Sequence, residues 1–157
     1  MARVYLETSF VSACVTTRTD AGSVYRRETS IEWMRTQSQR HDLFISAEVI
    51  NELSTPVYPQ AAEALSMISD IPVIGVDADI GGFAHVLVRE LVMPGPASGD
   101  AIHVAACVIF KIDYLLSWNV RHLANPNKMA HLRVICVRLG YMPPAIITPD
   151  LLWEISK

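Results

Sequence analysis

Short runs of β-branched and aromatic residues alternate with segments of helical spacing, and this alternation limits the possible folds most strongly. The runs lie at residues 4–6, 43–46, 72–76, 114–117 and 145–147. Strands that alternate with helical segments favour parallel pairing, because a parallel connection has to cross over the sheet. We therefore predict an α/β domain with a central parallel sheet of about five strands.

The helical segments carry their own start and stop signals. The clearest helix begins after Asp77, its expected N-cap. Ser98 and Asn127 are expected to cap two later helices, over residues 99–110 and up to Gly140, where a left-handed residue suits glycine. The apolar residues of the helix after Asp77 follow the i, i+3, i+4, i+7 spacing of one buried face: Ile80, Phe83, Ala84, Leu87, Val88 and Leu91.

Length and composition fit one domain over residues 1–157. Hydrophobic residues make up 51% of the chain and charged residues 18%, which excludes a disordered tail. The net charge of −3 provides no general attraction to nucleic acid or to anionic membranes. We expect any phosphate-bearing partner to be held by a local site.

The sequence favours a cytoplasmic protein. Its three cysteines are odd in number and form no C-x-x-C pair, so neither a disulfide framework nor a zinc cluster is indicated. Glu7 interrupts the apolar core that a signal peptide would need. The most apolar stretch, residues 101–116, carries His103, Lys111 and Asp113, so we expect no membrane segment.

Polar residues follow the predicted strands at the edge where open parallel sheets bind ligands. Glu7 follows the first strand, Glu48 and Glu52 lie on the helix after the second, Asp100 opens the helix before the fourth, and Asn119 follows the fourth. These side chains converge only if the first and fourth strands are neighbours. Three of them also have a structural interpretation: Asp100, in a first helical turn, can complement the helix dipole, and glutamates one turn apart, as Glu48 and Glu52 are, are common on surfaces. Glu7 is harder to explain in this way, because an unpaired charge at the edge of a core is costly.

A convergent group of carboxylates implies a cation. Carboxylates held together repel one another unless protons or a metal offset their charge. Mg²⁺ and Mn²⁺ prefer oxygen ligands and often lie between carboxylates and substrate phosphates. The chemistry that such a site supports is phosphodiester hydrolysis by a metal-activated water.

Other residues are candidates for supporting roles. Thr8 and Ser9 lie beside Glu7 and are expected to cap the first helix, and His103 shares a helix face with Asp100, where it can orient a neighbour. Residues 121–138 contain four basic residues and no acidic one, which is also compatible with an ordinary solvated surface. The candidates for steering a phosphate backbone are Arg121, Lys128 and Arg133.

In this order and spacing, the motifs resemble those of PIN-domain proteins, in particular the VapC-like toxin ribonucleases. The resemblance runs from the first strand to the fourth, and the segment from Gly140 to Pro149 resembles one PIN subgroup. The motifs that carry it are Leu6-Glu7-Thr8-Ser9, Ile45-Ser46 with Glu52, Ser98-Gly99-Asp100 with Ala101-Ile102-His103, and Ser117-Trp118-Asn119.

The resemblance implies a three-layer α/β/α fold and a Mg²⁺- or Mn²⁺-dependent ribonuclease, often the toxin of a type II toxin–antitoxin pair. By position, Glu7, Glu52, Asp100 and Asn119 are the catalytic quartet, and the first three are the metal ligands. Glu48 then lies next to the ligands rather than among them. The implied partners are an RNA substrate and a cognate antitoxin, and so apolar a chain is also a candidate for a homodimer.

Two positions depart from the usual family pattern. Glu7 and Asn119 stand where most members and many members, respectively, carry aspartate. Fewer ligand charges weaken a hard-cation site, so the alternative is a catalytically degenerate PIN module that binds RNA or a protein partner. A phosphotransfer receiver domain is disfavoured because none of the lysines, Lys111, Lys128 and Lys157, follows a late strand.

Overall fold

The chain is described by a computed structural model, which places residues 1–96 and 99–155. A parallel sheet of five strands forms the centre, in the order β3-β2-β1-β4-β5. The first strand is therefore central and pairs with both the second and the fourth. The strands are β1 (Ala2–Leu6), β2 (His41–Ser46), β3 (Val73–Ile74), β4 (Tyr114–Leu116) and β5 (Ala145–Ile147).

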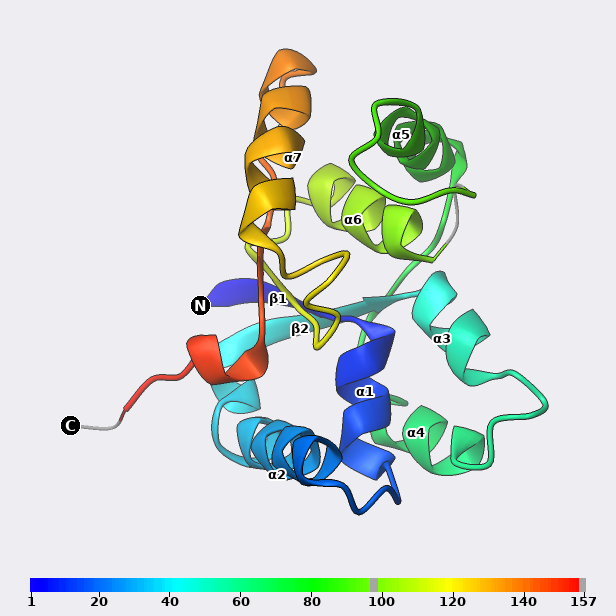
Figure 1. Cartoon of the computed structure of the whole chain (residues 1–157), viewed down its shortest axis with the longest axis vertical. Helices are drawn as coiled ribbons and strands as arrows, with labels where there is room; N and C mark the ends of the chain where they lie inside the picture. The colour runs from blue at the N-terminus through cyan, green and yellow to red at the C-terminus, as the bar shows by residue number, and fades with distance from the viewer. Residues whose placement is uncertain (97–98, 156–157) are drawn as a thin grey trace.

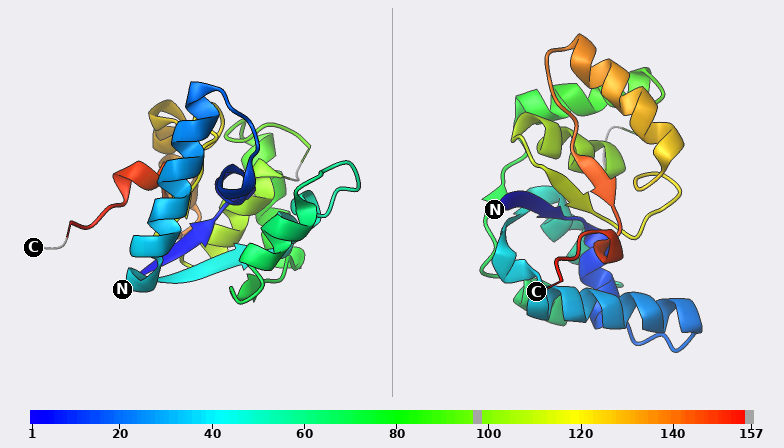
Figure 2. Two further views of the ribbon diagram at one scale, coloured as in Figure 1. Left: turned by 90° about the horizontal axis from the view of Figure 1, so that it is seen from below. Right: turned by 90° about the vertical axis from the view of Figure 1, so that its left-hand side faces the viewer.

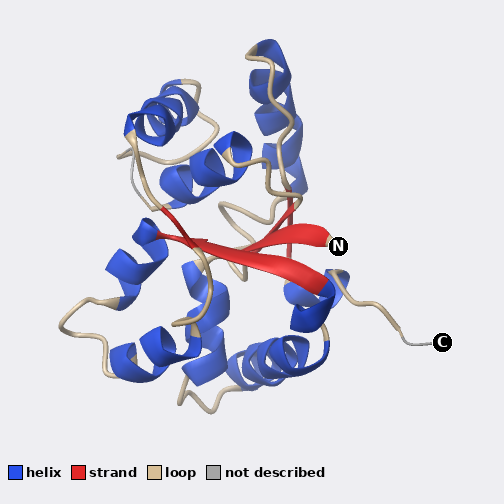
Figure 3. Ribbon diagram, turned by 180° about the vertical axis from the view of Figure 1, so that it is seen from behind, coloured by secondary structure: helices blue, strands red, loops and turns tan. Residues whose placement is uncertain are grey.

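Helices cover both faces of the sheet, which confirms the three-layer α/β/α arrangement (Figure 1). One face carries α1 (Thr8–Val15), α2 (Ala21–Thr36) and α4 (Ala61–Met67), and the other carries α5 (Ala78–Arg89), α6 (Asp100–Ile109) and α7 (Pro126–Arg138). The same separation is visible from the side and from behind (Figures 2 and 3). Helix α3 (Ala47–Leu53) continues from the end of β2, and two short 3₁₀ helices lie at Ser38–Arg40 and Pro149–Leu151.

The core centres on β1 and α6. In β1, Val4, Tyr5 and Leu6 have no exposed surface, because a central strand of a parallel sheet is covered on both faces. Helix α6 is buried along most of its length, with His103 as its one polar core residue. None of the helices in the described part of the chain is both long and apolar enough to cross a membrane.

Several predicted helix boundaries are confirmed. Asp77 caps α5, since its Oδ1 accepts a hydrogen bond from the Ile80 amide at 3.0 Å. Gly140 has a φ of 82°, in the left-handed region expected after α7. Helix α6 also lies where it was predicted, with Gly99 at its N-cap position; the expected cap, Ser98, lies outside the described residues.

Two boundary predictions were wrong. Helix α5 ends at Arg89, so Leu91 lies beyond it, with 82% of its surface exposed and a φ of 60°. Helix α7 is capped by Asn125 rather than Asn127: the Asn125 side chain accepts from the Asn127 amide at 3.0 Å. Pro126 explains the shift, because its fixed φ favours the first helical position and thereby starts the helix earlier.

Candidate metal centre

The strand order brings the candidate residues to one edge of the sheet. Because β1 lies between β2 and β4, the carboxyl ends of all three strands are adjacent. Glu7 directly follows β1, and its amide donates to the carbonyl of Leu116, the last residue of β4, at 3.1 Å. Glu52 lies on α3, which follows β2. The condition for convergence is therefore met.

Glu7 is a buried carboxylate held at the start of α1. Its side chain is 6% exposed and caps the helix by accepting from the Ser9 amide at 2.9 Å. The same Oε2 accepts from the hydroxyl groups of Ser9 and Ser117, the latter at 3.0 Å. Burial raises the pKa of Glu7, although the charge of His103 and these hydrogen bonds partly oppose the rise. Its Oε1 makes none of these bonds and faces His103 Nε2 at 3.9 Å.

Glu52 is the second carboxylate of the site and contacts Thr8 and His103. Its Oε1 accepts from the Thr8 hydroxyl at 2.6 Å and lies 2.5 Å from His103 Nε2. Burial, the largest single effect, raises the pKa of Glu52, but the hydrogen bond and charge of His103 and the bond from Thr8 together lower it below its usual value. Glu52 therefore remains a carboxylate at neutral pH.

His103 connects this site to the core through a chain of hydrogen bonds. Its imidazole is fully buried, and Nδ1 lies 2.6 Å from Tyr5 Oη, which is 2.7 Å from Ser46 Oγ. Burial lowers the pKa of His103, but the hydrogen bond to Glu52 and the charges of Glu7, Glu52 and Asp100 together raise it. With both ring nitrogens protonated, Nε2–H donates to Glu52, Nδ1–H donates to Tyr5, and the Tyr5 hydroxyl donates to Ser46.

Asp100 and Asn119 form a second contact beside the first group. The Asn119 Nδ2 atom donates to Asp100 Oδ2 at 3.4 Å, while its Oδ1 accepts from the His122 amide at 3.1 Å. Burial raises the pKa of Asp100, and the charges of His103 and His122 oppose the rise. Asn119 thus presents its amide nitrogen, rather than its oxygen, to the neighbouring carboxylate.

Gly99 fits the turn that leads into α6. Its φ of 52° lies in the left-handed region that favours glycine. A Cβ atom at this position would lie 3.7 Å from Glu52 Oε2, an ordinary contact distance. The backbone conformation, rather than a lack of space, is therefore the reason for glycine before Asp100.

Glu7, Glu52 and His103 have the spacing of metal ligands. One ligand atom from each lies within 4.8 Å of the others, and in the described parts of the chain no other trio of histidine, cysteine, aspartate or glutamate does so. Two carboxylates suit Mg²⁺ or Mn²⁺. Glu7 and Glu52 therefore fit a divalent cation, with Asp100 just outside the trio. His103, which the sequence suggested as a supporting residue, belongs to the trio but donates Nε2–H to Glu52, so it orients this carboxylate rather than supplying a ligand atom.

The other predicted residues are distributed unevenly. Thr8 and Ser9 contact Glu52 and Glu7. Their predicted role as caps of the first helix was wrong: Glu7 is the N-cap of α1, and its side chain accepts from the Ser9 amide. Glu48 is half-buried, and its amide donates to Ser46 Oγ at 3.2 Å, as at a capped helix start. The Lys128 ammonium donates to the Val92 carbonyl at 3.2 Å. Arg121 and Arg133 are exposed.

Sequence reasoning missed two residues that hold the site together, Tyr5 and Ser117. Tyr5 contacts His103 and Ser117 donates to Glu7, and both are fully buried. A signal for Tyr5 was present: a tyrosine in the middle of a buried strand needs a hydrogen-bond partner for its hydroxyl. Ser117 carried none, because a serine at a strand end is usually solvated.

Comparisons by sequence found no match: no protein-family model matches the chain, and no curated protein does. Similar solved structures do exist. VapC20 from Mycobacterium tuberculosis, described as a toxin that cleaves the sarcin-ricin loop, has a TM-score of 0.58 at 21% identity, over 82% of this chain and 94% of that one.

Two further structures show the same similarity. VapBC2 from Rickettsia felis, bound to a promoter DNA fragment, has a TM-score of 0.55 at 16% identity, over 76% of this chain and 89% of that one. FitAcB from Neisseria gonorrhoeae has a TM-score of 0.59 at 12% identity, over 95% of this chain and 99% of that one. These likenesses confirm the fold that the sequence motifs indicated. The chain has the PIN-domain fold.

Proposed function

We propose that this protein is a divalent-metal-dependent endoribonuclease, the toxin of a type II toxin–antitoxin pair. The observation that carries the proposal is the convergence of Glu7, Glu52 and His103 within 4.8 Å at the edge of a parallel sheet where ligands bind. The similarity to VapC20, a toxin that cleaves an RNA loop, supports the same reading.

Some of these residues would hold the ion, and others would orient its ligands. Glu7, Glu52 and Asp100 would hold Mg²⁺ or Mn²⁺. His103 would fix the Glu52 carboxylate through its 2.5 Å contact, and Asn119 would fix Asp100 through its amide nitrogen. When bound, the ion activates a water as nucleophile and offsets the charge that develops on the phosphate. The burial of Glu7 excludes bulk water from that side of the site.

The substrate would be RNA, and the partners would be a cognate antitoxin and a second copy of the chain. Exposed apolar residues on α7, Val134 and Val137 among them, offer a surface for such contacts. VapBC2, a structural relative, is described as bound to a DNA fragment from its promoter. Arg121, Lys128 and Arg133 stay predictions as RNA-contacting residues. The site of action would be the cytoplasm.

The first test is Mn²⁺ binding by electron paramagnetic resonance, with Asp100→Ala alongside. This measurement does not depend on finding the natural RNA. We expect the wild type to bind the ion and the variant to bind it more weakly, because a carboxylate ligand is lost. Cleavage of cellular RNA by the wild type alone would then complete the assignment.

The second candidate is a degenerate module that binds RNA or a protein without cleaving it. A contact of Asn119 favours this candidate. Its side-chain oxygen accepts a hydrogen bond from the His122 amide instead of facing the carboxylates. An ion site with one fewer oxygen ligand is weaker. A protein that binds RNA but takes up no Mn²⁺, even at millimolar concentration, would support this candidate and contradict the first.

A further inference from the structure

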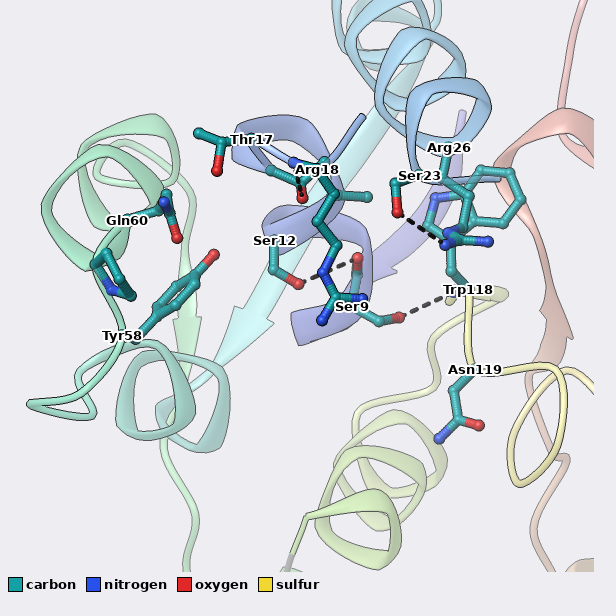
Figure 4. Close-up of a pocket in the computed structure, with 13 residues that line it drawn as sticks. Ser9, Ser12, Thr17, Arg18, Ser23, Arg26, Tyr58, Gln60, Trp118 and Asn119 are labelled. Carbon is teal, nitrogen blue, oxygen red and sulfur yellow. Dashed lines mark hydrogen bonds between the residues drawn. The ribbon is translucent and has the colours of Figure 1, made fainter. Parts of the chain in front are cut away.

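A polar pocket opens directly beside the candidate metal centre. It has a volume of about 690 Å³ and lies between α1, the start of α2, the segment before α4, and the residues after β4 (Figure 4). Ser9 and Asn119 line it, and these residues also contact Glu7 and Asp100. The pocket and the carboxylates are therefore continuous, although they carry different chemistry.

Two arginines give this pocket a positive charge. Arg18 and Arg26 line it, and no aspartate or glutamate is among its described lining residues. Neither guanidinium forms an ion pair with a described residue; Arg26 has only a 3.4 Å contact with Ser23 Oγ. The pKa of the nearby Asp20 is lowered, and hydrogen bonds from Ser23 are the main cause. The charge of Arg18 is the smallest of the effects on the pKa of Asp20. Both arginines are thus available to an anion.

Hydroxyl groups and aromatic rings complete the lining. Thr17 and Ser23 offer hydroxyls that can donate to phosphate oxygens, whereas the Ser12 hydroxyl already donates to the Thr8 carbonyl at 3.0 Å. Trp118 and Tyr58 stand on opposite sides of the pocket (Figure 4). The indole of Trp118 is held in place because its Nε1 donates to Ser30 Oγ at 2.8 Å. Fixed aromatic rings beside guanidinium groups are typical of surfaces that bind single-stranded nucleic acid.

We propose that this pocket binds the single-stranded segment of RNA next to the cleaved phosphate. Arg18 and Arg26 contact backbone phosphates, and Trp118 and Tyr58 stack on bases. This inference rests on the proposed ribonuclease function. It explains how a chain with a net charge of −3 holds a polyanion near a group of carboxylates: the negative charge is confined to the ion site, and the neighbouring cations receive the strand.

The test measures binding of a short, fluorescein-labelled 2′-O-methyl RNA by fluorescence polarisation over a range of salt concentrations. This probe is single-stranded and resists cleavage, so binding is separated from activity. The variant is Arg18→Ala with Arg26→Ala. The matched control is Arg89→Ala with Arg138→Ala, which removes the same charge from exposed arginines outside the pocket.

We expect the pocket variant to bind at least about tenfold more weakly and the control to change by less than about twofold. The slope of log K against log salt should fall in magnitude by about 1.4 in the pocket variant, since each phosphate contact on a single strand contributes about 0.7. Tyr58→Ala should weaken binding without changing this slope, because stacking releases no counterions. Equal losses in the two arginine pairs, or no binding by the wild type, would overturn the proposal.

Mn²⁺ binding separates this proposal from the one on which it rests. The Arg18→Ala, Arg26→Ala variant should bind Mn²⁺ as the wild type does. If the wild type takes up no Mn²⁺ but its RNA binding still depends on these arginines, the ribonuclease assignment fails and the RNA pocket stands. If Mn²⁺ binds normally and RNA binding ignores the arginines, the pocket fails and the ribonuclease assignment stands. An acidic peptide that competes as well as RNA would also contradict the pocket.

Discussion

His103 Nε2 lies 2.5 Å from Glu52 Oε1, so a fully buried imidazole on α6 holds a carboxylate that comes from α3. The other ring nitrogen is 2.6 Å from the Tyr5 hydroxyl on β1. The His103 ring therefore links α6 to α3 and to the central strand β1 at the expected ion site. Removing an orienting contact behind a metal ligand typically lowers ion affinity or activity by about 10–100-fold.

Tyr5→Phe removes the hydroxyl behind His103 and keeps the ring. We expect Mn²⁺ affinity to fall about tenfold, because the imidazole loses the contact that orients it. We also expect the free energy of unfolding to fall by about 1–3 kcal/mol, since His103 and Ser46 are left buried without this partner. Electron paramagnetic resonance and urea unfolding measure the two effects. Tyr141→Phe is the matched control: its ring packs against Phe83, away from the site, and equal effects in both variants would contradict the prediction.

Glu52→Gln should weaken Mn²⁺ binding by about tenfold or more, because it removes one ligand charge without changing the shape of the side chain. Glu48→Gln is the comparison, one helical turn earlier on α3 and outside the trio of possible ligands. Titration of Mn²⁺ against each variant measures the difference. A larger loss in Glu48→Gln would reverse the assignment of these two glutamates.

Asp100→Ala should abolish RNA cleavage and leave the fold intact. The carboxylate is only half-buried, and its described hydrogen bond is the long one from Asn119, so its removal costs little stability. Cleavage assays, with far-UV circular dichroism as the control for folding, measure the two outcomes. Retained cleavage would remove Asp100 from the catalytic group.

His41 should make the protein less stable in acid. Its ring stacks on Trp33 at a centroid distance of 6.0 Å, and both nitrogens are buried without a hydrogen-bond partner in the described residues. Burial lowers the pKa of His41, with Glu154 opposing. The unfolded chain then binds the proton more readily, so stability is complete above the unfolded pKa near 6.5 and is lost as the pH falls below it.

His41→Phe tests this sign, because phenylalanine keeps the stacked ring and cannot be protonated. The loss of unfolding free energy between about pH 8 and pH 5 should be smaller in this variant than in the wild type. His131→Phe, at an exposed position, is the matched control for replacing a histidine by phenylalanine. An unchanged pH dependence in His41→Phe would show that protonation of this ring has no part in acid unfolding.

The helices show which sequence signals were sufficient. Helix α5 was predicted correctly at its start because Asp77 is a strong cap in front of a regular apolar stripe. Helix α4 was missed: it has seven residues and no side-chain cap, so its stability comes from packing against α1 and α3 rather than from local signals. Leu91 fitted the apolar period but lies past the end of α5, because periodicity does not fix where a helix stops.

The sequence by itself determined the five strands, their parallel direction and the residues that follow them. Strand formation and helix capping depend on local residue types, and the alternation of strands with helices implies parallel connections. It also named Glu7, Glu52 and Asp100 as candidates. Only the tertiary structure decided that β1 lies between β2 and β4, which brings these residues together. It alone placed His103 against Glu52 and left Arg18 and Arg26 unpaired beside the site. Such contacts join segments far apart in the chain, and no local pattern encodes which buried hydrogen-bond partners will meet.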